Sequence, residues 1–481
     1  MKTFRLLSTA GLALALLASA GFAAGFNVVD FGAVPDGTTK NTAAFAKAIA
    51  AVKQAGGGTL TVPAGRYLTG SIHLESNLTL HLEAGAVLLY SGDPADSPLV
   101  ESRWEGTTAW TYGPLLYANG KENIAITGRG TIDGQGHHWW WRRGDKTPRA
   151  EIAEKARPAW VALRDRIQAG EGATVTREDF VEAANFIRPS LVVPFNCRNI
   201  LVEGVTITNS PMWLLHTIYS ENITVRGVSF LSDGPNGDGY DIDSCRNVRI
   251  SDCYFDTGDD CIVIKSGRDA DGRRVGRPTE LVTITNCVMH RGHGAVVIGS
   301  EMSGGIRDIT ASNIVCRGTD RGIRLKTQRG RGAVVENIRF DNWVIIDAPR
   351  EAIHITSNYG RTEPEERGER TPIYRNIAIS NVTVINAATV VAIDGITEQP
   401  VGQVRMSDIN GTGKRGFICS LTDDLELHDI RIDAAEGSPF VFTNSSRLLL
   451  DNLRTASERA FSDIVRMENV SDVTTVGPQA K

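Results

Sequence analysis

Three features are scarce in this chain of 481 residues, and each scarcity excludes a class of protein. Seven cysteines are too few for a disulfide-stabilised scaffold of this length. Positive charge is not in excess, because 51 Lys and Arg stand against 56 Asp and Glu and give a net charge of −5. That balance argues against a nucleic-acid-binding protein, which is more often basic. Beyond the N-terminus no apolar run reaches the roughly 20 residues that a membrane-spanning helix needs.

The N-terminus has the parts of a secretory signal peptide. Lys2 and Arg5 supply positive charge, residues 6–17 form a short apolar stretch, and residues 18–20 or 21–23 offer a cleavage site. The apolar stretch is short for a transmembrane anchor. The sequence therefore predicts an exported protein, periplasmic or secreted, with no membrane segment once the signal is removed.

Glycine and one recurring pattern are abundant. The 49 glycines are about one residue in ten, against a usual share of about 7%, which indicates many tight turns or a flexible chain. The recurring pattern starts with Asn and then alternates apolar and other residues, as short strands do. Three successive copies start at residues 199, 222 and 247, so their spacings are 23 and 25 residues. Such a period with short strands is typical of a solenoid. The clear copies start at Asn123, Asn199, Asn222, Asn247, Asn337 and Asn376.

These repeats predict an all-β fold, a right-handed single-stranded parallel β-helix. Each coil pairs with the coils above and below it, and stacking buries a core that one coil could not bury alone. A leucine-rich repeat is an alternative, but the leucine periodicity is absent, and an antiparallel sandwich would lack the Asn-anchored repetition. Cys253 and Cys287 occupy one position of the repeat, so we expect them to stack inside as apolar residues.

The predicted organisation is a signal peptide over residues 1–23 and one solenoid domain over residues 24–481. A helix is expected near the start, at residues 42–54, where apolar residues recur at helical spacing. Residues 139–190 are charged and helix-like and break the repeat, which predicts a loop or helical excursion from the solenoid. Such excursions often build binding sites.

Successive coils also carry charged residues that the repeat does not require. In stacked coils these residues would share one face, and Asp238 and Asp259, 21 residues apart, would lie one coil apart. Crowded acids raise one another's pKa, which places a proton donor beside ionised bases, as glycoside hydrolysis requires. A solvated turn is the plain alternative for a single Asp after Gly, and the spacing does not fit an EF-hand calcium loop. The set is Asp238, Asp259, Asp260, His293, Arg324 and Lys326.

In their order along the chain these motifs resemble those of glycoside hydrolase family 28, the polygalacturonases. Two departures from the family's signatures are Gly237 in place of Thr and Leu325 in place of Ile, and neither side chain supplies the chemistry. The resemblance covers nearly the whole mature chain and implies the pectin-lyase-like form of the β-helix. The matching segments are Asn236-Gly-Asp238, Gly258-Asp-Asp260, Gly292-His-Gly294 and Arg324-Leu-Lys326.

The resemblance implies inverting hydrolysis of α-1,4-galacturonosyl linkages in an acidic plant polysaccharide or oligogalacturonide. Asp259 would protonate the leaving oxygen, while Asp238 and Asp260 would hold and deprotonate the attacking water. His293 would tune this hydrogen-bond network. No metal and no cofactor are implied, and a monomer is expected. The residues implied to bind the substrate are Arg324 and Lys326, through the galacturonate carboxylate, together with Asn236 and Tyr359.

A basic run supports an anionic substrate independently of the resemblance. A charge run is usually a solvated face, but beside three acids on one face of a solenoid it favours an anion site. The run comprises Arg317, Arg321, Arg324, Lys326, Arg329 and Arg331.

The mode of attack and the substrate stay open at the level of sequence. The long spacing from Asp260 to His293 and the segment 299–305 resemble bacterial exo-acting members, and the excursion at 139–190 could close one end of a cleft. Three alternatives remain: a rhamnogalacturonan-directed hydrolase of the same family, a calcium-dependent pectate lyase, and a non-catalytic carbohydrate-binding β-helix.

Overall fold

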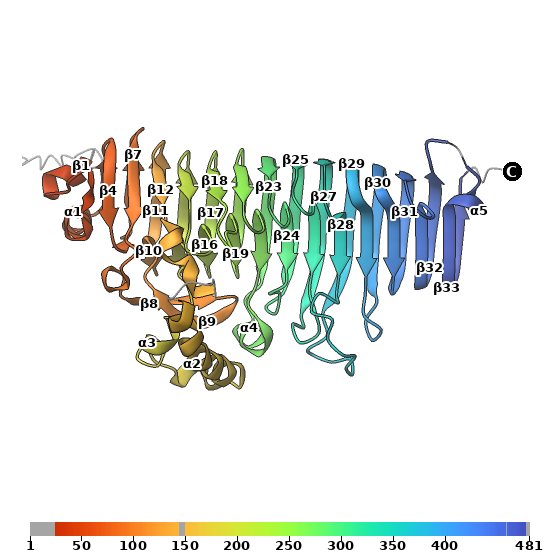
Figure 1. The fold of residues 1–481 in the computed structure, drawn as a ribbon, viewed down its shortest axis with the longest axis horizontal. Coiled ribbons are helices and arrows are strands. Elements are labelled where there is room, and N and C mark those ends of the chain that lie inside the picture. Colours follow the sequence, from red (N-terminus) through yellow and green to blue (C-terminus); the bar gives the residue numbers. More distant parts are fainter. Residues whose placement is uncertain (1–24, 144–149, 458, 478–481) are drawn as a thin grey trace, which may run out of the picture.

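The molecule is one long solenoid (Figure 1). The computed structural model describes residues 25–143, 150–457 and 459–477, so the predicted signal peptide lies outside the described residues. Thirty-one strands form one continuous sheet in which the neighbouring strands are parallel, and the coils are right-handed. The predicted right-handed parallel β-helix is therefore confirmed.

The strands stack in three columns along the solenoid axis. The site column contains β5 (Ile72–His73), β10 (Leu116–Asn119), β13 (Val192–Phe195), β16 (Leu215–Ile218), β19 (Tyr240–Asp243), β22 (Ile262–Lys265), β24 (Val296–Gly299), β26 (Ile323–Lys326) and β28 (Glu351–Thr356). The second column contains β1 (Gly25–Asn27), β3 (Gly58–Val62), β6 (Leu78–Leu82), β11 (Glu122–Gly128), β14 (Arg198–Glu203), β17 (Glu221–Arg226) and β20 (Arg246–Ser251). The third contains β2 (Asp36–Lys40), β4 (Gly65–Thr69), β7 (Ala86–Tyr90), β12 (Thr131–Asp133), β15 (Thr206–Thr208), β18 (Ser229–Ser232) and β21 (Tyr254–Thr257).

Toward the C-terminus the strands lengthen and bend through more than one column. They are β23 (Thr279–His290), β25 (Ile306–Arg317), β27 (Val334–Ile346), β29 (Ile373–Asp394), β30 (Val401–Ser420), β31 (Thr422–Ala434), β32 (Phe440–Arg454) and β33 (Val465–Val476). β8 (Leu99–Trp104) and β9 (Thr107–Tyr112) form a separate antiparallel hairpin.

Helices cover one end and one side of the solenoid. α1 (Thr42–Gln54), at the bounds that the sequence predicts, packs its apolar face on β1, β3 and β5 at the N-terminal end. α2 (Ala150–Gln168) and α3 (Phe180–Ala183) pack against each other and on β9, and they lie with α4 (Asp269–Val275) on one side of the solenoid (Figure 1). The remaining helices are α5 (Phe461–Ile464) and five short 3-10 helices, η1 (Val28–Phe31), η2 (Pro94–Asp96), η3 (Gly136–His138), η4 (Trp140–Arg143) and η5 (Glu171–Thr174). No helix among the described residues is long and apolar enough to cross a bilayer.

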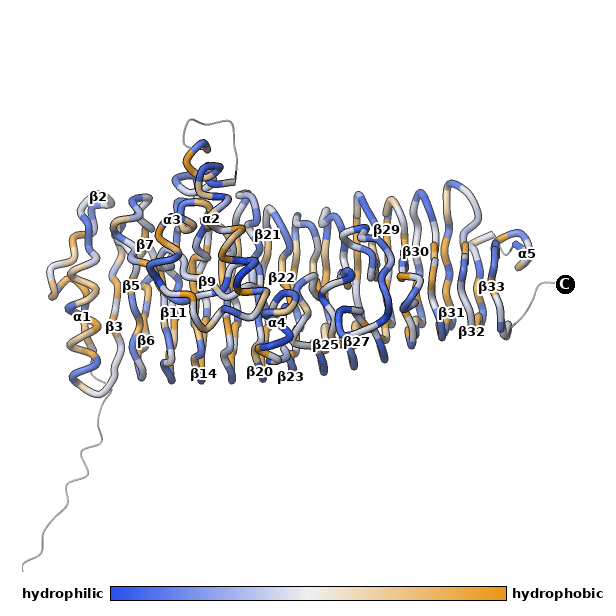
Figure 2. Tube along the Cα trace, turned by 90° about the horizontal axis from the view of Figure 1, so that it is seen from below, coloured by the Kyte–Doolittle hydropathy of each residue, from blue (hydrophilic) through white to orange (hydrophobic). Residues whose placement is uncertain are grey.

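Identical faces of successive coils make the core. In Figure 2 apolar and polar residues alternate along the strands, as expected when every second side chain points inward. Phe230 and Phe255 stack in adjacent coils with ring centres 4.7 Å apart. All seven cysteines are buried and none forms a disulfide, so the expectation that Cys253 and Cys287 pack inside as thiols is confirmed. One aliphatic stack of the site column comprises Ile242, Ile264, Ile298, Leu325 and Ile355.

The asparagines of the repeat form a ladder at a turn between columns. Each adopts the left-handed backbone conformation, with φ of 57° at Asn199 and Asn222 and 56° at Asn247. Asn side chains tolerate this conformation better than most. The side-chain amide of Asn222 donates to Asn199 Oδ1 at 3.1 Å, and that of Asn247 donates to Asn222 Oδ1 at 2.7 Å. Turn geometry and contacts between coils therefore explain why asparagine recurs at this position of the repeat.

Candidate active site

The predicted site residues meet in one cavity on the site column. The cavity has a volume of about 790 Å³ and lies on the same side of the solenoid as α2, α3 and α4. Acids and bases dominate its lining. Every residue that the sequence singled out for the site lines it: Asp238, Asp259, Asp260, His293, Arg324, Lys326, Asn236 and Tyr359.

The strand register decides which acids lie above one another. Tyr240 pairs with Ile262, so Asp238, two residues earlier, is in register with Asp260. The backbone confirms this, since Gly239 N–H donates to the carbonyl of Asp260 at 3.0 Å. The expectation that Asp259, 21 residues after Asp238, lies close to one coil away is confirmed, because this coil is 22 residues long by that pairing. Asp259 occupies the turn before Asp260.

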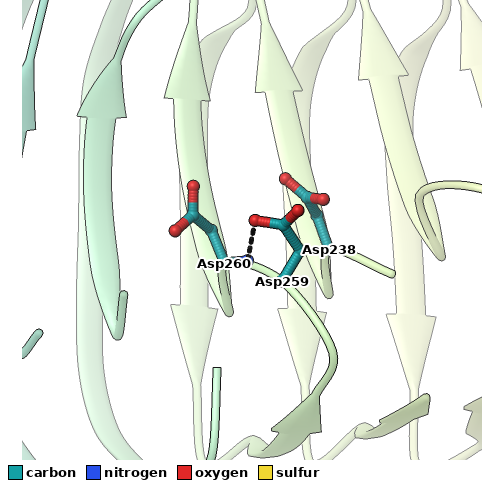
Figure 3. Close-up of side chains that lie close together, drawn as sticks. All are labelled: Asp238, Asp259 and Asp260. Carbon is teal, nitrogen blue, oxygen red and sulfur yellow. Dashed lines mark hydrogen bonds between the residues drawn. The ribbon is translucent and has the colours of Figure 1, made fainter. Parts of the chain in front are cut away.

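Three carboxylates converge in the cavity (Figure 3). One oxygen each of Asp238, Asp259 and Asp260 lies within 4.8 Å of the other two. Asp238 is 3% exposed and Asp260 is 1% exposed. Burial, followed by the charges of Asp259 and Asp241, raises the pKa of Asp238 well above its usual range. This direction favours the protonated form of Asp238, as expected of like charges in a buried cluster.

Asp260 is the ionised member of the cluster. Lys326 Nζ lies 2.7 Å from Asp260 Oδ2 and Arg324 Nη1 lies 3.4 Å from Oδ1. Burial alone would raise the pKa of Asp260, but these two cations outweigh it and hold the pKa below its usual range. The same cations offset part of the negative charge of the cluster.

Glycine lets these cations reach across a coil. Arg324 and Lys326 are on β26, whereas Asp260 precedes β22, so β24 lies between them. Gly294 stands at that point, and a Cβ there would lie 2.5 Å from Val297 Cγ2 and 3.2 Å from Asp260 Oδ1. A side chain at Gly294 would therefore separate Asp260 from its cations.

Asp259 is held by hydrogen bonds from three directions. Its Oδ1 accepts from the backbone N–H of Asp260 at 3.0 Å (Figure 3) and lies 2.9 Å from His293 Nδ1. Its Oδ2 accepts from the amide of Asn236 at 3.4 Å. Arg188, from the predicted excursion, donates to Asn236 Oδ1 at 2.7 Å and so orients that amide. Sequence reasoning missed Arg188, because nothing local separates it from the neighbouring charged residues.

Tyr359 lies beside the two cations of the site. The guanidinium carbon of Arg324 is 5.5 Å and Lys326 Nζ is 5.4 Å from the centre of its ring. The Tyr359 side chain is half exposed, so its ring presents one face to the cavity. An aromatic face beside fixed cations suits a sugar ring that carries a carboxylate.

Comparison with known proteins identifies the family. Residues 169–426 match the profile of Glycosyl hydrolases family 28. The chain belongs to this family. As a family 28 member it is a glycoside hydrolase, and residues 25–96 additionally match the profile described as Rhamnogalacturonase A/epimerase, pectate lyase-like.

Three relatives of this family 28 chain are similar over most of its length. A probable polygalacturonase of Vitis vinifera is 34% identical over 80% of this chain and 73% of its own length. An exo-poly-alpha-D-galacturonosidase of Dickeya chrysanthemi is 31% identical over 69% of this chain, which spans only 57% of that protein. The crystal structure of a hyperthermoactive exopolygalacturonase from Thermotoga maritima matches this chain with a TM-score of 0.74 and 39% sequence identity. The match covers 81% of this chain and 87% of that protein.

Only part of the basic run of the family 28 chain lines the cavity. Arg317 and Arg329 are not in the lining; exposed Arg317 lies 3.5 Å from Asp347, and buried Arg329 is paired with Glu398. The four members that line the cavity are Arg321, Arg324, Lys326 and Arg331. The anion-site interpretation therefore applies to four of the six residues.

One wall of the cavity comes from a segment that sequence reasoning overlooked. The tip of the β8–β9 hairpin brings Glu105 into the lining, where it lies 3.1 Å from Arg268. Among the described residues the excursion at 139–190 contributes none to the lining; α2 and α3 support the hairpin from behind. Trp213, Lys265 and Glu301 also line this end of the cavity and were not among the predicted site residues. Only Glu301 had a local signal, within the glycine-rich segment 299–305.

Proposed function

We propose that this glycoside hydrolase cleaves α-1,4-galacturonosyl linkages of polygalacturonate and releases product from a chain end. The observation that carries the proposal is the meeting of three acids with Arg324 and Lys326 in one cavity. The acids supply proton transfer, and the cations lie where the carboxylate of a bound uronate can pair with them. The names of the relatives, polygalacturonase and exopolygalacturonase, support the same substrate.

We propose an inverting mechanism with three roles. Asp259 donates a proton to the leaving oxygen, while Asp238 and Asp260 hold the water that attacks the anomeric carbon. One oxygen of each acid lies within 4.8 Å of the others, which is closer than the roughly 6.5–9.5 Å between the two carboxyl groups of most inverting enzymes. We therefore infer inversion because Asp238 and Asp260 offer two acceptors for one attacking water. NMR of the first anomer released tests this: the β-anomer supports inversion, and the α-anomer means retention.

The identity of the proton donor can be tested separately, because burial raises the pKa of Asp238 while the family resemblance assigns the donor role to Asp259. A substrate with a good leaving group, such as a dinitrophenyl galacturonide, needs little acid assistance. Asp259→Asn should lose polygalacturonate hydrolysis by at least about 100-fold, within the range of general acid catalysis, yet keep much of its activity on the aryl substrate. Asp238→Asn should lose both. The reverse pattern would exchange the two roles.

The β8–β9 hairpin, whose tip lines the cavity, supports exo action. Arg103 of β8 binds Asp243 of the solenoid at 2.6 Å, with both side chains fully buried. Thr108, after the hairpin turn, donates through N–H and hydroxyl to Asp271 of α4, at 2.9 and 3.1 Å. The hairpin is thus tied to the solenoid and to α4, and we propose that it stops a bound sugar chain from extending past this end of the cavity.

Product analysis on polygalacturonate tests exo action directly. A chain-end enzyme releases galacturonic acid, or one short product, from the first minutes while the viscosity of the polymer falls slowly. Early mixed oligomers with a rapid loss of viscosity would overturn the exo assignment and leave polygalacturonate hydrolysis standing.

A rhamnogalacturonan-directed activity is the second candidate. The match of residues 25–96 to the rhamnogalacturonase profile favours it, but that segment holds none of the site residues. Hydrolysis of alternating rhamnose–galacturonate oligomers in preference to oligogalacturonides would support it. A calcium-dependent lyase would give an unsaturated product that absorbs ultraviolet light and disappears with a chelator. A non-catalytic binding protein would bind oligogalacturonide and release nothing.

We also propose that the protein is exported and works as a monomer. The motivation for export is the N-terminal sequence, with positive charge, a short apolar stretch and small residues before position 24. N-terminal sequencing of protein from periplasm and medium tests export, and a chain still starting at Met1 in the cytoplasm would contradict it. Light scattering tests the oligomeric state.

A further inference from the structure

A further buried cation, Lys265, lines the cavity, and the mechanism above does not use it. Its Nζ lies 3.0 Å from Glu301 Oε2, 3.5 Å from Asp241 Oδ1 and 4.5 Å from the centre of the Trp213 ring. The Lys265 side chain is 6% exposed and that of Asp241 is fully buried. A buried charge group of this kind is costly to form, so its place beside the reacting acids needs a reason.

The two acids near the start of β19 lack hydrogen bonds that would stabilise their ionised forms. Neither oxygen of Asp241 has a hydrogen-bond partner among the described residues, and Asp238 Oδ1 has none either. A buried carboxylate without donors is ionised only if a cation is close. Lys265 lines the same cavity as Asp238 and lies 3.5 Å from Asp241. Its charge lowers the pKa of Asp238, whereas the charges of Asp259, Asp241 and Asp260 raise it.

Glu301 competes with these aspartates for Lys265. Burial would raise the pKa of Glu301, but Lys265, Arg331 and Arg268 outweigh it and hold that pKa well below its usual range. Glu301 is therefore ionised whenever the enzyme works, and it draws Lys265 toward itself. The charge of Lys265 is divided between Glu301 on one side and the β19 aspartates on the other.

We propose that Lys265 and Glu301 are positioning residues that control the ionisation of Asp238 in opposite directions. Lys265 favours the ionised form of Asp238, and Glu301 weakens that effect by holding Lys265. The proposal rests on the proposed function, in which ionised Asp238 helps to hold and deprotonate water. In that role the ionisation of Asp238 appears in the acidic limb of the pH profile, where activity rises with pH.

Two single variants should move that limb in opposite directions. Lys265→Met removes the cation, so ionised Asp238 becomes less favourable and the acidic limb of kcat/KM on polygalacturonate moves to higher pH. Glu301→Gln releases Lys265 toward the aspartates, so the limb moves to lower pH. Each shift should be about 1 pH unit or more, the usual effect of one close charge. A merely structural role would lower activity at every pH and would not produce opposite shifts.

Two further variants serve as controls. Lys265→Arg keeps the charge and should leave the limb within a few tenths of a unit of the wild type. The double variant Lys265→Met/Glu301→Gln removes both charges and should return the limb toward the wild-type position. If Lys265→Met fails to fold, as circular dichroism would show, the Glu301→Gln shift and the Lys265→Arg control still decide. An unmoved limb, or shifts in the same direction, overturns this proposal, whereas a wild-type enzyme inactive on polygalacturonate overturns the proposed function instead.

Discussion

His293 is the residue of the site whose charge responds to pH near neutrality. The hydrogen bond with Asp259 raises its pKa, partial burial opposes this, and the charges of Asp259 and Asp260 add to the rise. Below this raised pKa the imidazolium can donate to Asp259, and above it that charge is lost. We therefore expect kcat to decline as pH rises through the pKa of His293.

His293→Gln should lower kcat by about 10- to 100-fold, a modest share of acid–base catalysis, and should flatten the alkaline limb of the pH profile. His354 is the matched control, since it lines the same cavity but burial lowers its pKa to about 4. His354→Gln should not move the alkaline limb. An alkaline limb that survives His293→Gln unchanged would assign it to another group.

At the residue scale the acids could be predicted from sequence and several of their neighbours could not. Asp238 is in register with Asp260 and Asp259 with His293 in successive coils, so the stacking of coils brings these residues together. Trp213 and Glu105 reach the cavity through tertiary contacts, from a turn and from a hairpin tip, and neither carries a local pattern. Sequence spacing also does not show that Asp260, and not Asp259, is in exact register with Asp238. The length of a turn can change by one residue without a change in the repeat pattern.

Among the elements, the asparagine ladder is the one whose sequence pattern and geometry agree most closely. Asn222 combines a left-handed backbone with hydrogen bonds to Asn199 and from Asn247. Asn222→Gly keeps the backbone freedom and should lower the free energy of unfolding by about 1 kcal/mol through the lost hydrogen bonds. Asn222→Ala adds the left-handed cost and should lose about 1–2 kcal/mol more.

Urea denaturation followed by circular dichroism measures both variants at the ladder. Equal losses would mean that the stabilisation by the repeated asparagine comes from hydrogen bonds alone. No loss in either variant would mean that the ladder does not stabilise the fold. The hairpin β8–β9 shows the limit of such element-level reading. Its strands pair with each other and not with the solenoid sheet, so the coil repeat could not predict it.

The whole molecule is mildly acidic, but its cavity holds Arg321, Arg324, Lys326 and Arg331 beside the acids. We expect a polyanionic substrate to be drawn to the cavity by forces that salt screens over roughly 10 Å at 0.1 M. Raising the salt concentration to about 0.5 M should therefore increase KM for polygalacturonate several-fold and change kcat little. Steady-state kinetics at fixed pH measures this. As the control, inhibition by an uncharged polymer that competes with polygalacturonate should not depend on salt. A salt effect on kcat alone would place the electrostatics in the chemical step.

At this scale the sequence predicted the architecture well, because a solenoid repeats one local rule. Length here counts coils, so the described residues between 25 and 477 form one continuous solenoid, where a compact fold of that length would be divided. The side structure of α2, α3 and the hairpin obeys no repeat, and its position over one end of the cavity depends on contacts such as Arg103 with Asp243.

The buried free thiols can report where along the solenoid unfolding begins. They are distributed over successive coils, from Cys197 through Cys287 to Cys419, and all are shielded from solvent. An alkylating reagent can modify each only when its own coil opens. The order in which mass spectrometry finds them labelled would therefore report where along the axis the molecule comes apart first, without any engineered probe.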